Sequence, residues 1–271
     1  MAILKAKSAV ETYKLKASSR DFNDLSGRTG RPDLTEYILE NIAEIVELPK
    51  EGLFVDVGCG TGLLLKKLRN KSDPLACCKL VGILPSYEEV ERVTTEFAKQ
   101  NIDIEIYYGM IQQMPFDDQS VDYLVCNGVL NAGGQAIDDI DAAFKEFKRV
   151  LKSGSKLYVG ELPELDEMVE RPYGSSVFLW LLWSLRKQSL HRFWLNVKSV
   201  FRSIFLGETF IVAPKNIFYM IPDEFIAFAS GYGFDLINVS KHRELDSSGN
   251  PRENAYRWNY MFCKKVAKLN T

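Results

Sequence analysis

The stretch LFVDVGCGTG, residues 53–62, predicts the fold of this chain. Residues 53–57 are apolar except for Asp56, a pattern that is typical of a buried strand. Three glycines follow at alternate positions: Gly58, Gly60 and Gly62. Glycine allows a tight turn and the close approach of a ligand, and the helical stretch that follows, residues 63–69, begins with free N–H groups. We therefore expect a strand, a ligand-binding turn and a helix.

Strands and helices alternate on both sides of this turn. Apolar runs predict strands at 80–84, 104–108, 121–126 and 157–159, and amphipathic stretches predict helices at about 33–48, 87–100 and 137–151. A helix at 222–230 and an antiparallel hairpin of strands 234–241 and 256–264, joined by polar residues 244–254, are expected near the end. The alternation predicts an α/β fold: a doubly wound, seven-stranded, mostly parallel sheet with an antiparallel C-terminal strand.

Breaks in this alternation predict three parts of the chain. Residues 1–32 are expected to form a mobile N-terminal segment with a helix and a Gly- and Arg-rich loop. Residues 33–163 and 215–271 form the α/β core, and residues 164–214 form a helical cap inserted after the fifth strand.

The composition excludes several classes of protein. The chain has 271 residues, 46% hydrophobic and 26% charged, as in an ordinary globular protein. A formal net charge of −2 gives no general reason to expect a nucleic-acid partner. The five cysteines include no CxxC pair, so we expect reduced thiols and no metal. No signal sequence is recognised and the most apolar run, residues 177–185, is too short to cross a bilayer, so a soluble cytoplasmic protein is expected.

The spacing of the glycines discriminates between classes of ligand. Dinucleotide-binding enzymes use GxGxxG, but here the third glycine position is a leucine, Leu63 or Leu65, whichever glycine begins the count. The phosphate-binding string GxxxxGK[ST] is absent. An NAD-dependent oxidoreductase is therefore disfavoured, and a tight turn without a ligand is the structural alternative.

The remaining pattern, a strand with an acidic residue followed by GxGxG, resembles the first motif of the class I S-adenosylmethionine-dependent methyltransferases, methyltransferase type 11-like. Three further segments resemble motifs of this family: the second-strand segment 81–86, the adenine-side loop 109–116 and the fourth-strand segment 121–130. Residues 144–154 are similar to the family's E-x-x-R-V-L-K-P-G stretch, with Ser153 in place of proline. The resemblance covers about residues 53–161 and implies S-adenosylmethionine as the cofactor.

The resemblance also implies roles for single residues. Asp56 is expected near the amino end of the methionine moiety, and the Asn127 carbonyl is expected to accept a hydrogen bond from its ammonium group. Tyr13 is expected to close over the methionine carboxylate, with simple packing as the alternative. The turn is expected beneath the ribose and methionine portions, through Gly58, Cys59, Gly60 and Gly62. Positions expected beside the ribose and adenine are Leu84, Met110 and Ile111.

Two of these positions depart from the family pattern. Leu84 stands where the family usually has an acid that binds both ribose hydroxyls, and Met110 stands where it often has an aspartate facing the adenine amino group. Each missing charge-assisted hydrogen bond is worth about 1.5–3 kcal/mol, so losing both weakens cofactor binding by roughly two to four powers of ten unless another group substitutes. The candidate substitutes are Glu88, Gln112 and Gln113.

The inserted segment carries an uneven set of side chains. Residues 171–207 contain six Lys or Arg, eight aromatic residues and no Asp or Glu. Three interpretations stay open: a helical pair that packs its aromatic face on the core, a lid whose cations bind an anionic acceptor, or a peripheral contact with a membrane surface that suits a lipid-linked glycan.

Methyl transfer from a sulfonium is an SN2 displacement that depends on alignment, and a hydroxyl acceptor benefits from a base. The candidates for a catalytic role are His191 in the insertion, His242 after the sixth strand, Glu161 at the end of the fifth strand, and Asn131, which can orient an acceptor but cannot act as a base. We expect transfer to a hydroxyl of a small-molecule or glycan acceptor. N- or C-methylation, or a degenerate relative with weak cofactor binding, are the alternatives, and the sequence does not predict the oligomeric state.

Overall fold

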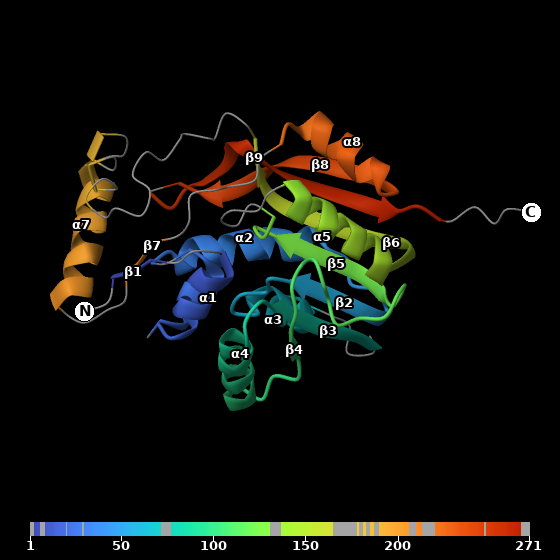
Figure 1. Ribbon diagram of the computed structural model, residues 1–271, viewed down its shortest axis with the longest axis horizontal. Coiled ribbons are helices and arrows are strands. Elements are labelled where there is room, and N and C mark those ends of the chain that lie inside the picture. The colour runs from blue at the N-terminus through green and yellow to red at the C-terminus, as the bar shows by residue number, and fades with distance from the viewer. Residues whose placement is uncertain are drawn as a thin grey trace, which may run out of the picture.

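The computed structural model describes residues 3–5, 9–19, 21–28, 30–71, 77–130, 137–164, 178, 181–182, 185–186, 190–205, 210–212, 220–246 and 248–266. A seven-stranded sheet runs through the described part of the chain, and helices lie on both of its faces (Figure 1). The strands are β2 (Glu51–Val57), β3 (Cys77–Leu84), β4 (Glu105–Tyr108), β5 (Val121–Asn127), β6 (Leu151–Pro163), β8 (Phe234–Leu245) and β9 (Pro251–Lys264).

The order of the strands across the sheet is β4-β3-β2-β5-β6-β9-β8. The first five are parallel to one another, and β9 is antiparallel to both β6 and β8. The predicted doubly wound, mostly parallel sheet with an antiparallel C-terminal strand is therefore confirmed. In such a sheet the carboxyl ends of the parallel strands meet at one edge, where ligands bind.

Two apolar layers cover the sheet. One contains side chains of α2 (Pro32–Ile45), α3 (Leu63–Lys71) and α4 (Tyr87–Lys99), and the other contains side chains of α5 (Ile137–Val150) and α8 (Pro222–Gly231). Phe144 of α5 is fully buried and meets Phe225 of α8 edge to face, with ring centroids 5.6 Å apart. Edge-to-face aromatic pairs stabilise such layers beyond the area that they bury.

Local signals set the beginnings of the helices. Ser86 precedes α4, where its Oγ accepts a hydrogen bond from the Glu89 N–H at 3.3 Å and bonds the Glu89 carboxylate at 2.7 Å. Ser86 and Glu89 have the spacing of a capping box, with the carboxylate bonded to the Ser86 hydroxyl. Pro32 and Pro222 occupy the first positions of α2 and α8, where no N–H is needed.

The C-terminal hairpin is longer than the sequence predicts. β8 and β9 continue through the polar residues that we expected to join them, and only the short stretch 246–250 remains as the turn. The register places Glu244 opposite Arg252, and the two form an ion pair. Polar residues extend these strands because oppositely charged cross-strand pairs stabilise an exposed hairpin without burial. His242 consequently lies within β8 and not after it.

The N-terminal segment and the insertion meet in a second, small sheet. The N-terminal elements are β1 (Ile3–Lys5), α1 (Ala9–Ala17) and the 3-10 helix η1 (Phe22–Ser26), and the described elements of the insertion are α7 (Leu190–Phe205) and β7 (Phe210–Val212). β1 and β7 pair in parallel. The division into three parts and the mobility of the first stay predictions. None of the described helices has the length and apolar character that a membrane span requires.

Candidate functional site

The glycine turn lies between β2 and α3, where the sequence predicts it. Gly58, Gly60 and Gly62 all adopt positive φ angles, +71°, +54° and +71°, which side chains rarely tolerate. The Gly58 N–H donates a hydrogen bond to the Ile83 carbonyl at 2.8 Å, which ties the turn to β3. A Cβ atom at Gly58 would overlap a Val129 methyl group, so packing requires glycine there as well.

Asp56 lies on β2 beside this turn and is buried, with 4% of its surface exposed. Burial raises the pKa of its carboxyl to about 8, and among the described residues no hydrogen bond or charge offsets the effect. A buried carboxyl without a partner is costly to ionise unless a cation joins it. Asp56 therefore provides an acceptor for a cationic ligand group.

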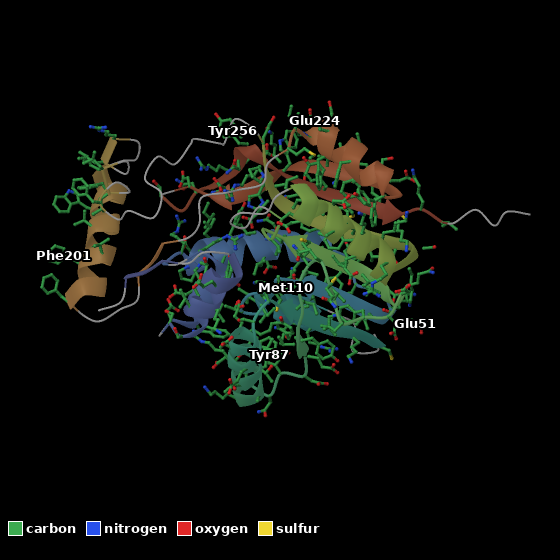
Figure 2. The ribbon with its side chains drawn as sticks, in the orientation of Figure 1. Glu51, Tyr87, Met110, Phe201, Glu224 and Tyr256 are labelled. Atoms are coloured by element: carbon green, nitrogen blue, oxygen red, sulfur yellow. The ribbon has the colours of Figure 1, made fainter. Side chains whose placement is uncertain are left out.

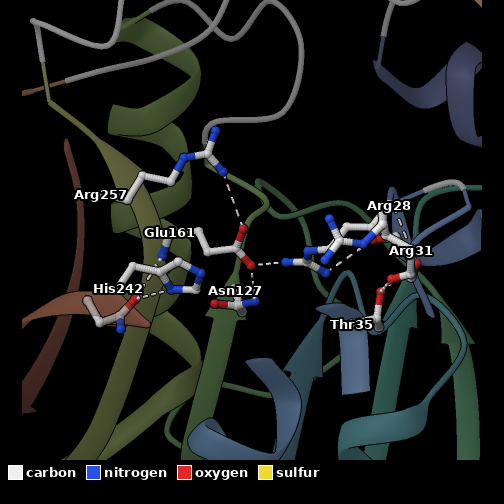
Figure 3. A network of polar contacts seen from close by, with 9 residues as sticks. Arg28, Arg31, Thr35, Asn127, Glu161, His242 and Arg257 are labelled. Atoms are coloured by element: carbon white, nitrogen blue, oxygen red, sulfur yellow. Dashed lines mark hydrogen bonds and ion pairs between the residues drawn. The ribbon is translucent and has the colours of Figure 1, made fainter. Parts of the chain in front are cut away.

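A buried carboxylate, Glu161, holds together side chains from distant parts of the chain at the end of β6 (Figure 3). Its Oε1 accepts hydrogen bonds from Asn127 Nδ2 at 2.8 Å and from the Arg28 guanidinium, which forms an ion pair with it. Its Oε2 lies 3.4 Å from Arg257 Nη1. Glu161 has a φ of +59°, a strained backbone conformation of the kind that clusters at functional sites.

Asn259 connects His242 to this network. Its Oδ1 accepts a hydrogen bond from the Glu161 N–H at 3.1 Å and lies 3.2 Å from His242 Nδ1. Because Oδ1 only accepts, Nδ1 carries the proton and Nε2 keeps a free lone pair. Nε2 is buried and has no hydrogen-bond partner among the described residues. Burial lowers the pKa of His242 to about 4, so the ring is neutral near pH 7.

The N-terminal segment lies against the glycine turn. A Cβ atom at Gly60 would lie 3.0 Å from the Leu25 carbonyl oxygen of η1, and Leu25 itself is buried. The Tyr13 hydroxyl lies beside Gly27, and burial raises the pKa of this phenol. Arg28 follows directly and reaches Glu161, so the segment joins the turn to the edge of the sheet.

Residues 55–159 match the family described as a methyltransferase domain. This stretch is similar to methyltransferase domains. Its sheet order and glycine turn agree with this match, and the resemblance to class I S-adenosylmethionine-dependent methyltransferases is confirmed. S-adenosylmethionine is the cofactor that this family implies.

Two curated relatives resemble just under half of the chain. A sterol 4-C-methyltransferase of Caenorhabditis elegans is 31% identical over 124 residues, which are 45% of this chain and 34% of that protein. The 24-methylenesterol C-methyltransferase 2 of Arabidopsis thaliana is 28% identical over 135 residues, 47% of this chain and 33% of that protein. The chain thus spans about a third of the length of these curated relatives.

A solved structure from Thermotoga maritima supports the fold of the methyltransferase domain. It is described as an S-adenosylmethionine-dependent methyltransferase and possible histamine N-methyltransferase, and it superposes with a TM-score of 0.54 at 19% identity. The superposition covers 95% of this chain and 100% of that one. At this identity the likeness shows the fold alone.

The residues near the turn fit the ammonium end of S-adenosylmethionine. The Asp56 carboxylate lacks an offsetting charge, and Asn127 Oδ1 is a buried acceptor without a partner among the described residues. An ammonium group is a cationic donor of the kind that buried, unpaired acceptors require. The three glycines of the turn add no side chains on the same edge.

The residues expected near the nucleoside offer fewer polar partners. Leu84 is only 1% exposed and supplies no polar group, and Glu88 is paired with Lys14 at the surface at 2.8 Å. The buried carboxylate of α4 is instead Glu89, which accepts a hydrogen bond from the Ser86 hydroxyl. Gln112 Oε1 is buried without a partner among the described residues, which leaves Gln112 as the best placed of the three candidate substitutes.

Two of the four predicted catalytic residues, Glu161 and His242, lie in one hydrogen-bonded network, joined by Asn259. Asn131 lies outside the described residues, and His191 lies on α7 with a side chain that is also outside them. Three members of the network were not predicted: Arg28, Arg257 and Asn259. The only sequence signal near Arg28 is the Gly- and Arg-rich composition of its loop. The contact of Arg28 with Glu161 spans 133 residues, and no local spacing predicts such a contact.

Proposed function

We propose that this chain transfers a methyl group from S-adenosylmethionine to a hydroxyl oxygen of a small organic acceptor. The observation that carries the proposal is the His242 imidazole, which is buried and neutral and keeps an unpaired Nε2. It is linked through Asn259 and Glu161 to Asn127, at the end of the strand beside β2. Cofactor-binding residues and a proton acceptor therefore share one edge of the sheet.

On the cofactor side, Asp56 and Asn127 hold the ammonium group, and the turn from Gly58 to Gly62 supports the methionine and ribose portions. When bound, the cofactor supplies a methyl group already activated by its sulfonium. Tyr13 closes over the carboxylate, and Gln112 accepts a hydrogen bond from the adenine amino group in place of the aspartate that Met110 replaces. Leu84 and Ile111 supply apolar contact only.

On the acceptor side, His242 Nε2 accepts the hydroxyl proton as the oxygen attacks the methyl carbon. Proton removal in the transition state is worth about 10²–10⁴ in rate. Glu161 is a positioning residue, since its carboxylate already bonds Asn127 and the Arg28 guanidinium. Arg28 and Arg257 give the network a net positive charge, which suits an anionic acceptor. Asn131 and His191 stay candidates for contact with the acceptor.

Calorimetry with S-adenosylhomocysteine, the demethylated product, tests the cofactor part of the proposal. A ligand ammonium stabilises the ionised Asp56, so its pKa falls from about 8 and a proton is released on binding at pH 7. The measured enthalpy should therefore differ between phosphate and Tris buffers, and this difference should vanish in Asp56→Asn. No binding at millimolar ligand would contradict the proposal and favour a degenerate, non-catalytic relative.

Incorporation of a labelled methyl group into a panel of small hydroxylated acceptors tests the transfer itself. The panel should include neutral, phosphorylated, uronic and lipid-linked compounds. These are the classes of acceptor that we expect for a cytoplasmic enzyme, and the assay compares them directly. Product mass and an oxygen-linked methyl signal by NMR would support the proposal. Cofactor binding without transfer to any hydroxyl, with transfer to nitrogen or carbon instead, would contradict it.

Carbon methylation is the second candidate function. It is supported by the relatives from Caenorhabditis elegans and Arabidopsis thaliana, both named as sterol C-methyltransferases. Such an acceptor attacks through a carbon centre, so His242 would remove a proton after methyl transfer and not during it. A sterol in the acceptor panel decides between the two, because the label would then appear on carbon.

A further inference from the structure

Helix α7 presents an apolar face to solvent. Its members are Leu190, Trp194, Phe201 and Phe205, each between 57% and 71% exposed. Their spacing of four, seven and four residues places them along one side of a helix. Figure 2 shows Phe201 on the side of α7 that points away from the sheet. We call these four residues the α7 stripe.

A different side of α7 is buried. Val200 is only 8% exposed, so the helix already buries one apolar side. The apolar side chains of the α7 stripe are therefore not needed to pack α7 against the protein. Exposed apolar side chains that gather in this way mark a surface for a partner or a membrane, whereas scattered ones do not.

The charge of residues 171–207 indicates which kind of partner the α7 stripe binds. Residues 171–207 carry six Lys or Arg and no Asp or Glu, although the chain as a whole has a net charge of −2. Lys198, which is exposed, lies between Trp194 and Phe201 along the helix. Protein interfaces are depleted of lysine at their centres, whereas helices that lie on anionic membranes combine Trp, Phe and Leu on one face with Lys and Arg beside it.

We propose that α7 docks this chain onto the surface of an anionic lipid bilayer through the α7 stripe. The helix has 16 residues, so it is about 24 Å long and lies in the headgroup region without spanning the bilayer. Trp194 and Phe201 enter the acyl boundary, and the surrounding cations meet lipid phosphates. Docking is independent of the proposed methyl transfer, because it needs no acceptor and no turnover.

The position of α7 relates this surface to the candidate site. In Figure 1 α7 stands beyond α1, on the side of the sheet to which the parallel strands direct their carboxyl ends. β7, five residues after α7, pairs with β1 of the N-terminal segment. A bilayer under the stripe therefore faces the same end of the molecule as the glycine turn.

Vesicle flotation with the full chain tests the proposal. Vesicles of phosphatidylglycerol and phosphatidylcholine should bind the chain, and pure phosphatidylcholine vesicles should bind it far less. The double substitution Trp194→Glu and Phe201→Glu should lower the partition coefficient by roughly tenfold or more, since each side chain loses its apolar burial and gains a charge. Ile237→Glu is the matched control, because Ile237 is 51% exposed on the edge strand β8 and should leave binding unchanged.

A second measurement keeps the test independent of folding defects in the variant. Bromine atoms on the upper acyl chain should quench tryptophan fluorescence of the unaltered chain, and quenching should fall in Trp194→Phe, which preserves an apolar side chain. Unaltered circular dichroism verifies that each variant is folded. Equal binding to neutral vesicles, no binding to anionic ones, or self-association that hides the stripe in sedimentation experiments would overturn the proposal.

Discussion

At the scale of single residues, Asp56 and His242 are buried titratable groups whose pKa values move in opposite directions. Burial disfavours the charged form of each, so it raises the pKa of the acid to about 8 and lowers that of the base to about 4. Both side chains are therefore largely neutral near pH 7 in the free chain. Asp56 then has a proton to release, and His242 has a lone pair to offer.

Replacing Asp56 by Asn should stabilise the free chain at neutral pH. Between about pH 4 and pH 8 the unfolded chain has lost the proton that the native chain retains, so parent stability falls as the pH rises through this window. We expect the Tm of Asp56→Asn to exceed that of the parent at pH 7.5 by roughly 5 °C or more, since 1 kcal/mol shifts Tm by about 2–4 °C in a chain of this size.

Thermal unfolding followed by circular dichroism from pH 4 to pH 8 measures this effect. The gain should shrink toward pH 4, where both chains are protonated when unfolded. Exposed Asp103→Asn is the control and should show no gain at any pH. A gain in Asp56→Asn that is the same at every pH would contradict the assignment of the burial effect.

Replacing His242 by Gln should lower kcat and leave cofactor binding unchanged. Gln can still donate a hydrogen bond to Asn259 but offers no basic nitrogen, so we expect a loss of about 10²–10⁴ in kcat. In the parent, kcat should not vary with pH between 6 and 8, because a group with a pKa of about 4 is already deprotonated there. Equal turnover of parent and variant would exclude His242 as the proton acceptor.

At the scale of elements, the turn between β2 and α3 combines backbone conformation with packing. Gly62 has a φ of +71°, and a Cβ atom there would overlap the Phe97 ring of α4. Gly154 has a similar φ of +80°, but its nearest neighbour would be a Val266 methyl at 4.0 Å. A comparison of substitutions at the two positions therefore distinguishes the free-energy cost of a positive φ from the cost of the overlap with Phe97.

Gly62→Ala should destabilise the chain by more than Gly154→Ala. Both lose the freedom of glycine at positive φ, which costs about 1–2 kcal/mol, and only Gly62→Ala adds an overlap worth about 1–3 kcal/mol. Urea unfolding at equilibrium measures both free energies of unfolding. Equal losses in the two variants would show that Phe97 moves aside and that packing places no demand on this glycine.

At the scale of the whole molecule, Leu25 and Arg28 are among the residues that join the N-terminal segment to the core. Leu25 packs in the layer that contains α2, α3 and α4, and Arg28 pairs with Glu161 at the sheet edge. Burial lowers the pKa of Arg28 to about 10, so the guanidinium stays charged at neutral pH. The segment thus lies against the glycine turn at Leu25 and reaches the sheet edge through the ion pair of Arg28.

Arg28→Met should loosen this attachment. Glu161 would lose a charged partner while remaining buried, at a cost of about 1–3 kcal/mol, and residues 9–27 should exchange their amide hydrogens faster. Lys145→Met is the control, because Lys145 pairs with Asp141 at the surface and its loss should stay within about 0.5 kcal/mol. Hydrogen exchange followed by mass spectrometry distinguishes the two, and unchanged exchange in Arg28→Met would contradict the ionic contact.

The amino-acid sequence by itself determined the order of the strands of the seven-stranded sheet and of the helices between them, the glycine turn and the position of Asp56. These features depend on residues a few positions apart: apolar periodicity, alternate glycines and the residue types beside them. The sequence did not predict the strands β1 and β7, which lie in segments expected to be helix and loop. The long hairpin of β8 and β9 was predicted too short, because Glu244 and Arg252 extend the strands only once they face each other.

Only the tertiary structure decided which polar side chains meet. Arg28 and Glu161 are 133 residues apart, and His242 owes its free Nε2 to Asn259 on the neighbouring strand. The pairing of β1 with β7 likewise joins segments about 200 residues apart. Such contacts depend on the three-dimensional path of the chain, and burial then fixes the pKa values and hydrogen-bond roles that no local pattern encodes.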